Sequence, residues 1–188
     1  MRIRTLTLSP HPSCKPGPVT TLTASGSLDR SGRLALDYEL RGDLRSIRLA
    51  PPSAHPQRRE ELWRHTCFEA FVQRGEAAGY LEFNFSPAGD WAGYEFADYR
   101  IGRRNFESPA ISSAVSATNP ARLLLRARVD LGAPRAPGTP TADLARWRLN
   151  ITAVIESLDG SSSYWAAHHS PANPDFHDRA AFRVAFTD

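Results

Sequence analysis

The chain has 188 residues, 41% of them apolar, and its 23 basic and 20 acidic residues leave a net charge of +3. This length predicts a single domain over residues 1–188, and so small a charge does not indicate a nucleic-acid partner. Residues 1–10 lack the apolar centre of a secretory signal, and no stretch approaches the roughly 20 apolar residues of a membrane span. We therefore expect a cytoplasmic protein without a membrane or nucleic-acid partner. The sequence gives no indication of the oligomeric state.

Short runs of alternating apolar and polar residues, separated by turn residues, follow one another along the chain. This pattern and its spacing predict an all-β fold, an antiparallel β-sandwich with at most short helical turns. The predicted strands cover residues 33–40, 47–49, 66–73, 80–86, 92–99, 123–131, 148–156, 164–168 and 182–186. Helical turns are expected at 57–63 and 141–147.

Proline clusters mark the loops, because proline cannot lie in a central strand. The clusters fall at residues 10–18, 51–56, 134–140 and 171–174. The two cysteines, Cys14 in a proline-rich loop and Cys67 in a predicted strand, are too few for a disulfide framework. We expect both to be free thiols.

Residues 62–100 carry the clearest pattern in the chain. In the strand at 80–86, side chains of opposite character alternate, so Leu81, Phe83 and Phe85 point one way and Glu82, Asn84 and Ser86 the other. The preceding strand places Glu69 on its polar side, with Trp63 just upstream. An antiparallel pair would bring Glu69, Glu82 and Asn84 to one face. Carboxylate, carboxamide and aromatic groups together are typical of a sugar site.

The segments Cys67–Phe71 and Tyr80–Gly89 resemble the DOMON-like superfamily, in the branch similar to family 9 carbohydrate-binding modules. The resemblance extends over about residues 20–186 and is strongest at 62–100. It implies a β-sandwich that binds a small carbohydrate and performs no chemistry, so no enzyme and no cofactor is expected. A ligand-free scaffold and a cofactor-binding DOMON-type domain are the alternatives.

The resemblance also implies roles for individual residues. Family 9 modules hold a sugar between two tryptophans, and here Trp63 precedes Glu69 by six residues while Trp165 lies in a late strand. Each tryptophan could instead pack in the core. The proposed partners of the sugar hydroxyls are Glu69, Glu82, Asn84 and Asn150, which could alternatively form an ordinary polar sheet face. The family has a basic residue near the position of Glu82, and this sequence departs from it there.

Two catalytic alternatives are compatible with the same strands. Glu69 and Glu82 could be the acid and the nucleophile of a glycosidase, although the sequence shows nothing that would separate their pKa values. His65, Cys67 and Glu69 share a face and could form a cysteine-nucleophile relay. Alternate strand residues are about 7 Å apart, too far for such a relay without help.

The segment from His168 to Asp178 gathers three histidines and two aspartates. Its spacing matches no closed zinc pattern, and we expect no metal. We expect instead a loop that closes one end of the sandwich, anchored by Phe176, with its histidines forming hydrogen bonds. Other DOMON members bind haem through methionine and histidine, which is not expected here because Met1 is the single methionine. Haem ligation through two histidines, for example His65 and His168, stays open.

Overall fold

The computed structural model describes residues 1–108, 110–132 and 146–187. Antiparallel strands form nearly all of their regular structure, which confirms the all-β, sandwich-like prediction. The strands are β1 (Arg2–Pro10), β2 (Val19–Leu28), β3 (Arg33–Gly42), β4 (Cys67–Gln73), β5 (Tyr80–Phe85), β6 (Trp91–Phe96), β7 (Arg104–Asn105), β8 (Ile111–Asn119), β9 (Arg122–Asp130), β10 (Arg148–Glu156), β11 (Ser162–Ala166) and β12 (Val184–Ala185). Three short 3-10 turns are η1 (Leu44–Ser46), η2 (Leu62–Arg64) and η4 (Arg179–Ala181). No described helix is long and apolar enough to cross a membrane.

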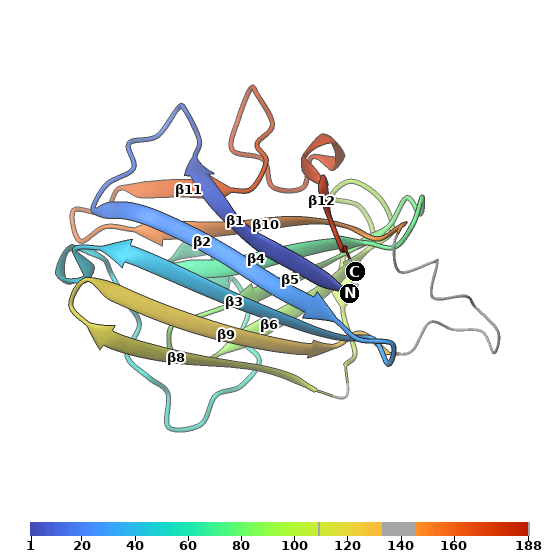
Figure 1. Ribbon diagram of the computed structural model, residues 1–188, viewed down its shortest axis with the longest axis horizontal. Coiled ribbons are helices and arrows are strands. Elements are labelled where there is room, and N and C mark those ends of the chain that lie inside the picture. The colour runs from blue at the N-terminus through green and yellow to red at the C-terminus, as the bar shows by residue number, and fades with distance from the viewer. Residues whose placement is uncertain (109, 133–145, 188) are drawn as a thin grey trace.

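Two sheets face each other, with the first in front in Figure 1 and the second behind it. The first sheet consists of β1, β2, β3, β9 and β8, and the second has the order β7-β6-β5-β4-β10-β11, with β12 also paired to β10. The end of β1 joins the sheets, because Ser9 pairs with Ala166 and Pro10 with Trp165. The strand path is therefore continuous from β7 to β8 and curls around one core.

Five expectations about strands need correction. Residues 2–10, 19–28, 104–105 and 111–119 form strands that the pattern did not predict, whereas residues 47–49 contribute a single bridge from Ile47 to Ser157. In β1 and β2 the alternation is broken by irregular register, between Ile3 and Leu6 and between Val19 and Thr21. Because a bulge interrupts the two-residue period, it weakens the sequence signal of a strand. The predicted helical turn at 57–63 shrinks to η2, and most of the turn predicted at 141–147 lies outside the described residues.

The main core lies between the two sheets. The first sheet supplies leucines, and the second supplies the apolar side chains of β4 and β5, in the predicted alternation. These core residues include Leu22, Leu34, Leu36, Leu40, Leu123, Leu125, Phe68, Ala70, Val72, Leu81, Phe83 and Phe85. Tyr38 crosses this core and donates its hydroxyl proton to the backbone oxygen of Glu69 at 2.7 Å. That bond links the first sheet to β4, which carries the predicted site residue Glu69.

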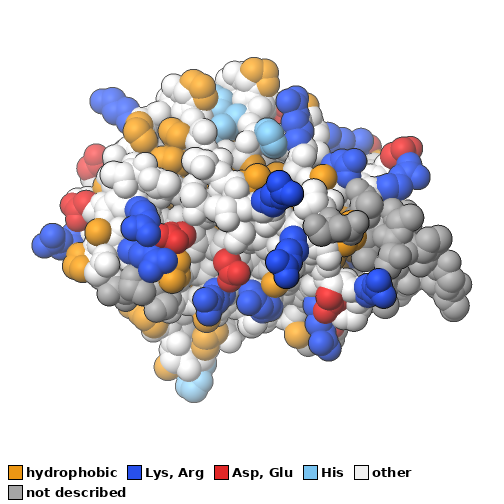
Figure 2. Space-filling view, viewed as in Figure 1, with side chains coloured by type: hydrophobic (Ala, Val, Ile, Leu, Met, Phe, Trp, Pro, Cys, Tyr) orange, Lys and Arg blue, Asp and Glu red, His pale blue; other side chains and the backbone are white. Residues whose placement is uncertain are grey.

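The outer face of the first sheet is a solvated, charged surface. Figure 2 shows basic and acidic side chains mixed over it. Arg122 pairs with Glu39 at 2.9 Å and Arg126 with Asp37 at 3.5 Å across β3 and β9. Such exposed pairs contribute little to stability and mainly keep the face soluble.

The outer face of the second sheet is buried, contrary to the ordinary polar face that the sequence allowed. A second apolar cluster covers it, formed by Phe71, Tyr80, Ala92, Tyr94, Phe96, Val154, Ala166, Phe176 and Phe182. Phe176 and Phe182 come from the segment after β11, which folds back over the sheet. The polar residues of β4 and β5 are thus enclosed between the sheet and this segment.

Candidate functional site

A cavity of about 420 Å³ opens on the outer face of the second sheet. Its lining combines carboxyl, aromatic and guanidinium groups from β4, β5, β6, β10, β11 and three loops. The lining residues are Trp63, Glu69, Phe71, Glu82, Phe96, Arg100, Arg103, Val154, Tyr164, Pro174, Phe176 and His177. A second cavity, of about 600 Å³, lies where β5, β6, β7 and β9 meet and contains none of the predicted site residues. The first cavity is the candidate site, and its size is typical of small-molecule pockets.

Glu69 and Glu82 lie at the bottom of this cavity. The β4–β5 register places Glu69 opposite Asn84 and Phe71 opposite Glu82, so the two glutamates are diagonal neighbours on one face, as predicted. They are 2% and 5% exposed. Each has one polar support, since Asn84 donates to Oε1 of Glu82 at 2.7 Å and the Thr152 hydroxyl donates to Oε2 of Glu69 at 3.2 Å. The remaining oxygens are acceptors for a ligand.

Burial separates the two carboxyl groups in acidity. Desolvation raises the pKa of Glu69 well above its usual range, and the charge of Glu82 raises it further. Desolvation also raises the pKa of Glu82, to about 6, although the bond from Asn84 and the charges of Arg100 and Arg103 oppose this. A charge on Glu82 therefore favours the protonated form of Glu69. The sequence showed no means of separating these pKa values, and the enclosed face provides one.

The Tyr80 hydroxyl links His177 to the loop that follows β6. The Tyr80 hydroxyl accepts the backbone N–H of Arg100 at 3.2 Å and lies 2.7 Å from Nδ1 of His177. Burial lowers the pKa of His177 to about 4, so the ring is neutral near pH 7. Its Nε2 lies 3.7 Å from Oε2 of Glu82. Sequence reasoning identified neither Tyr80 nor His177 as a member of the site.

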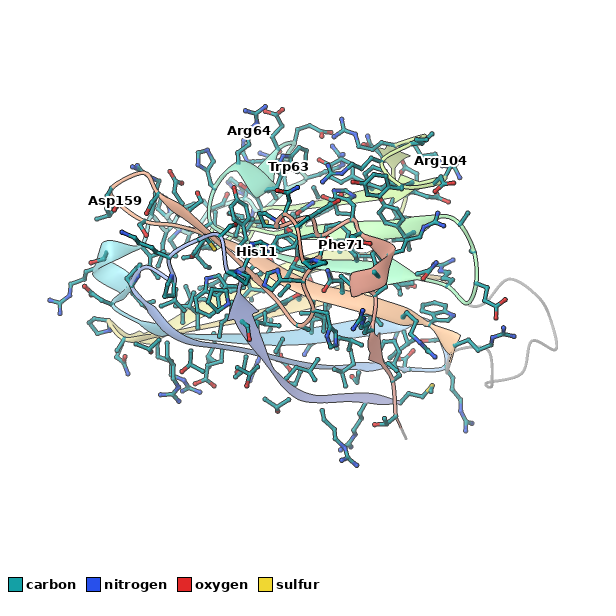
Figure 3. The ribbon with its side chains drawn as sticks, turned by 90° about the horizontal axis from the view of Figure 1, so that it is seen from above. His11, Trp63, Arg64, Phe71, Arg104 and Asp159 are labelled. Atoms are coloured by element: carbon teal, nitrogen blue, oxygen red, sulfur yellow. The ribbon has the colours of Figure 1, made fainter. Side chains whose placement is uncertain are left out.

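Trp63 forms one side wall of the cavity. It is half-buried on η2, and its ring packs edge-on against Tyr94 at 5.8 Å. Glu61, which precedes η2, has a φ of 61°, a left-handed conformation that costs a non-glycine residue free energy. Figure 3 shows Trp63 on the side of the second sheet that faces away from β1–β3. The sequence correctly placed this tryptophan near Glu69.

Trp165 does not reach the cavity, which corrects the predicted pair of tryptophans. It is 4% exposed in the core between the sheets, where its Nε1 donates to Oγ of Ser163 at 2.9 Å. Neighbouring residues on a strand point to opposite faces, so Tyr164 faces outward and lines the cavity instead. Tyr164 on β11 lies across the floor strands from Tyr94 on β6, the partner of Trp63. The second aromatic wall is therefore one residue before the predicted one.

Asn84 and Asn150 are fully buried and support the site from behind its lining. Asn84 orients Glu82, as described above. Asn150, opposite Phe71 on β10, donates to the backbone oxygen of Phe176 at 3.4 Å. Its side-chain oxygen has no hydrogen-bond partner among the described residues. Direct contact with a ligand, as predicted for both, would require the lining side chains to move.

Arg100 and Arg103, which the sequence did not indicate, supply the positive charge of the cavity. They follow β6 in a turn where Arg100 has a φ of 54°. Arg100 donates to Oδ1 of Asp175 at 2.8 Å. The guanidinium of Arg103 lies over Tyr94, 5.0 Å from the ring centroid, and 5.9 Å from that of Trp63. The basic residues of this cavity therefore come from the loop after β6 and not from β5.

The segment from His168 to Asp178 covers the outer face of the second sheet. This corrects the prediction that it closes one end of the sandwich. Phe176 is its buried anchor, 7% exposed and 6.3 Å from the ring of Phe71. Two of its three histidines form hydrogen bonds, as predicted: His169 lies 2.7 Å from the backbone oxygen of Ser9, and His177 lies 2.7 Å from the Tyr80 hydroxyl. Among the described residues, no three side chains of the metal-binding types gather in one place. His65 lies 2.9 Å from a carboxyl oxygen of Glu156.

Comparison with known proteins gives a likeness of fold. No family model and no curated protein sequence matches the chain. The fold is similar to the crystal structure of a proposed carbohydrate-binding protein from Bacteroides uniformis, with a TM-score of 0.68 and 16% sequence identity. The match covers 96% of this chain and 84% of that one. At this identity the likeness shows a shared architecture.

Proposed function

We propose that this protein is a non-catalytic module that binds a small carbohydrate, of the DOMON-like type similar to family 9 carbohydrate-binding modules. The observation that carries the proposal is one cavity with aromatic side walls and two buried carboxyl groups at its floor. The fold of the proposed carbohydrate-binding protein supports it.

The cavity matches the two kinds of surface that a sugar presents. The C–H faces of a pyranose pack well on flat aromatic rings, here those of Trp63 and Tyr164. The hydroxyl groups need in-plane acceptors and donors. Ionised Glu82 accepts, and protonated Glu69 can both donate and accept. Because the supports of both carboxyls are in place before binding, little side-chain entropy is lost when the sugar enters.

The test of this proposal is Trp63→Ala. The variant should fold like the wild type and lose about tenfold or more of its affinity for the best monosaccharide or disaccharide in a panel, measured by calorimetry, because half of the stacking surface is removed. Leu158→Ala is the matched control, since Leu158 is 57% exposed and lies outside the cavity. Equal affinities of the wild type and Trp63→Ala would contradict the role of Trp63.

Hydrolysis of a glycoside is a second candidate, because the two carboxyl groups differ in pKa in the way that an acid and a nucleophile do. Glu69 would be the acid and Glu82 the nucleophile. We favour binding alone, since the protein of similar fold is a proposed carbohydrate-binding protein and one oxygen of Glu82 already accepts from Asn84.

Aryl glycosides distinguish the two functions. The binding proposal expects nitrophenol release no faster than in buffer, for both anomers of several sugars. Release above that level which is lost in Glu82→Gln would instead establish the hydrolase. Calorimetry on the same variant shows whether it still binds the sugar.

A further inference from the structure

Arg103 differs from the other charged residues of the cavity in having no polar partner in the described part of the chain. Arg100 is paired with Asp175, and Glu82 is held by Asn84. No hydrogen bond or ion pair joins the Arg103 guanidinium to any other described residue. The side chain is nevertheless positioned, because it lies over the rings of Tyr94 and Trp63. A stacked guanidinium keeps its N–H donors in the plane of the group, where a ligand can reach them.

We propose that the ligand is an acidic sugar, such as a hexuronic acid, whose carboxylate pairs with Arg103 at the mouth of the cavity while its hydroxyls meet Glu69 and Glu82 at the floor. This inference rests on the proposed sugar-binding function. A carboxylate accepts two parallel hydrogen bonds from one guanidinium, a geometry that a neutral hydroxymethyl group cannot match.

The charge distribution favours an acidic ligand over an amino sugar. The negative charge of Glu82 is at the floor and is already stabilised by Asn84 and by the charges of both arginines. The positive charge of Arg103 is at the exposed rim, with Glu60 as a nearby acid that is itself bound to Tyr94 at 2.6 Å and to Arg58 at 2.6 Å. Among the described lining residues, the charged group without a hydrogen-bond partner is therefore a cation, the Arg103 guanidinium.

The experiment compares matched pairs of methyl glycosides by calorimetry: glucuronic acid with glucose, and galacturonic acid with galactose. The wild type should bind the acid of at least one pair about tenfold tighter than its neutral partner. Arg103→Gln should reduce that ratio to about one, and Arg103→Lys should leave an intermediate ratio, because lysine keeps the charge and loses the planar fork. The ratio should also fall at high salt.

Arg104→Gln is the control, because it removes the same charge from the adjacent residue. Arg104 is paired with Glu95 at 3.0 Å and does not line the candidate cavity; it is labelled in Figure 3. This variant should keep the wild-type ratio. Equal affinities for acid and neutral sugar in the wild type, or tighter binding of methyl glucosaminide than of methyl glucoside, would overturn the acidic-sugar proposal while sugar binding stands. Failure of every glycoside in the panel to bind would refute the proposed function itself.

Discussion

Glu82 connects most of the groups in the candidate site. Its carboxyl group accepts from Asn84, faces His177 and lies within the influence of Arg100 and Arg103. Each partner is neutral or distant, so nothing at hydrogen-bonding range fully compensates the lost hydration of the carboxylate. This explains why its pKa rises in the folded protein despite two nearby cations.

The first prediction concerns the pH dependence of stability. The pKa of Glu82 is raised from 4.5 to about 6 on folding, so the folded state holds this proton more tightly than the unfolded state does. The associated stability is present below the unfolded pKa and is lost as pH rises through 6. The free energy of unfolding of Glu82→Gln minus that of the wild type should therefore increase by about 2 kcal/mol from about pH 4 to about pH 7.5.

Urea unfolding at the two pH values measures this change. The difference between variant and wild type is the relevant quantity, because Glu69 titrates in both proteins. A stability difference that does not vary with pH would show that Glu82 keeps an ordinary pKa in the folded state.

The second prediction separates the two tryptophans that the sequence grouped together. Trp165→Phe should lower the free energy of unfolding, because the smaller ring leaves a void in the core and loses the bond to Ser163. The affinity of the folded variant for sugar should not change. A loss of affinity as large as that in Trp63→Ala would mean that Trp165 contributes to the site after all.

At the scale of elements, the site depends on how loops attach to the second sheet. The segment after β11 is held over the cavity by Phe176 and by Asp175, which accepts from Arg100 at 2.8 Å and from the Tyr99 hydroxyl at 2.6 Å. Arg179 adds a bond to Asp98. The loop after β6 and the segment after β11 thus form one cover, fastened by apolar and ionic contacts.

The third prediction tests this fastening. Phe176→Ala should cost about 3 to 5 kcal/mol of stability, the usual range for a buried phenylalanine, because the ring packs against Phe71 and Tyr164. EDTA should leave the melting temperature of the wild type unchanged, since the nearby histidines bond to protein groups. A fall in melting temperature with EDTA that zinc reverses would assign these histidines to a metal instead. Differential scanning calorimetry measures both effects.

For the whole molecule, the decisive feature is that one strand path closes around one core. The two chain ends lie together in Figure 1, and Arg2 and Thr187 exchange backbone hydrogen bonds of 2.6 Å and 2.8 Å. The ends are therefore joined by an antiparallel bridge, far along the chain from the hairpin of β4 and β5 that forms the floor of the site.

The fourth prediction follows from this closure. A circular permutant with the ends joined by a short glycine-serine linker and opened in the turn at Arg30 and Ser31 should keep the far-ultraviolet circular dichroism and sugar affinity of the wild type. The new ends lie in an exposed turn, where opening removes the bonds that Ser31 and Arg33 donate to Asp29. An unfolded permutant would show that this hairpin is needed for the sheet to form.

The sequence by itself determined the all-β class, the orientation of β4 and β5, and the shared face of Glu69, Glu82 and Asn84, because the two-residue period of a strand is a local property. It failed at Trp165 because a run of five residues, β11, does not say which face meets the core. Only the tertiary structure decided that the polar face is enclosed. The segment after β11 covers it, and this long-range packing buries the carboxyl groups, separates their pKa values and brings Arg100 and Arg103 beside them.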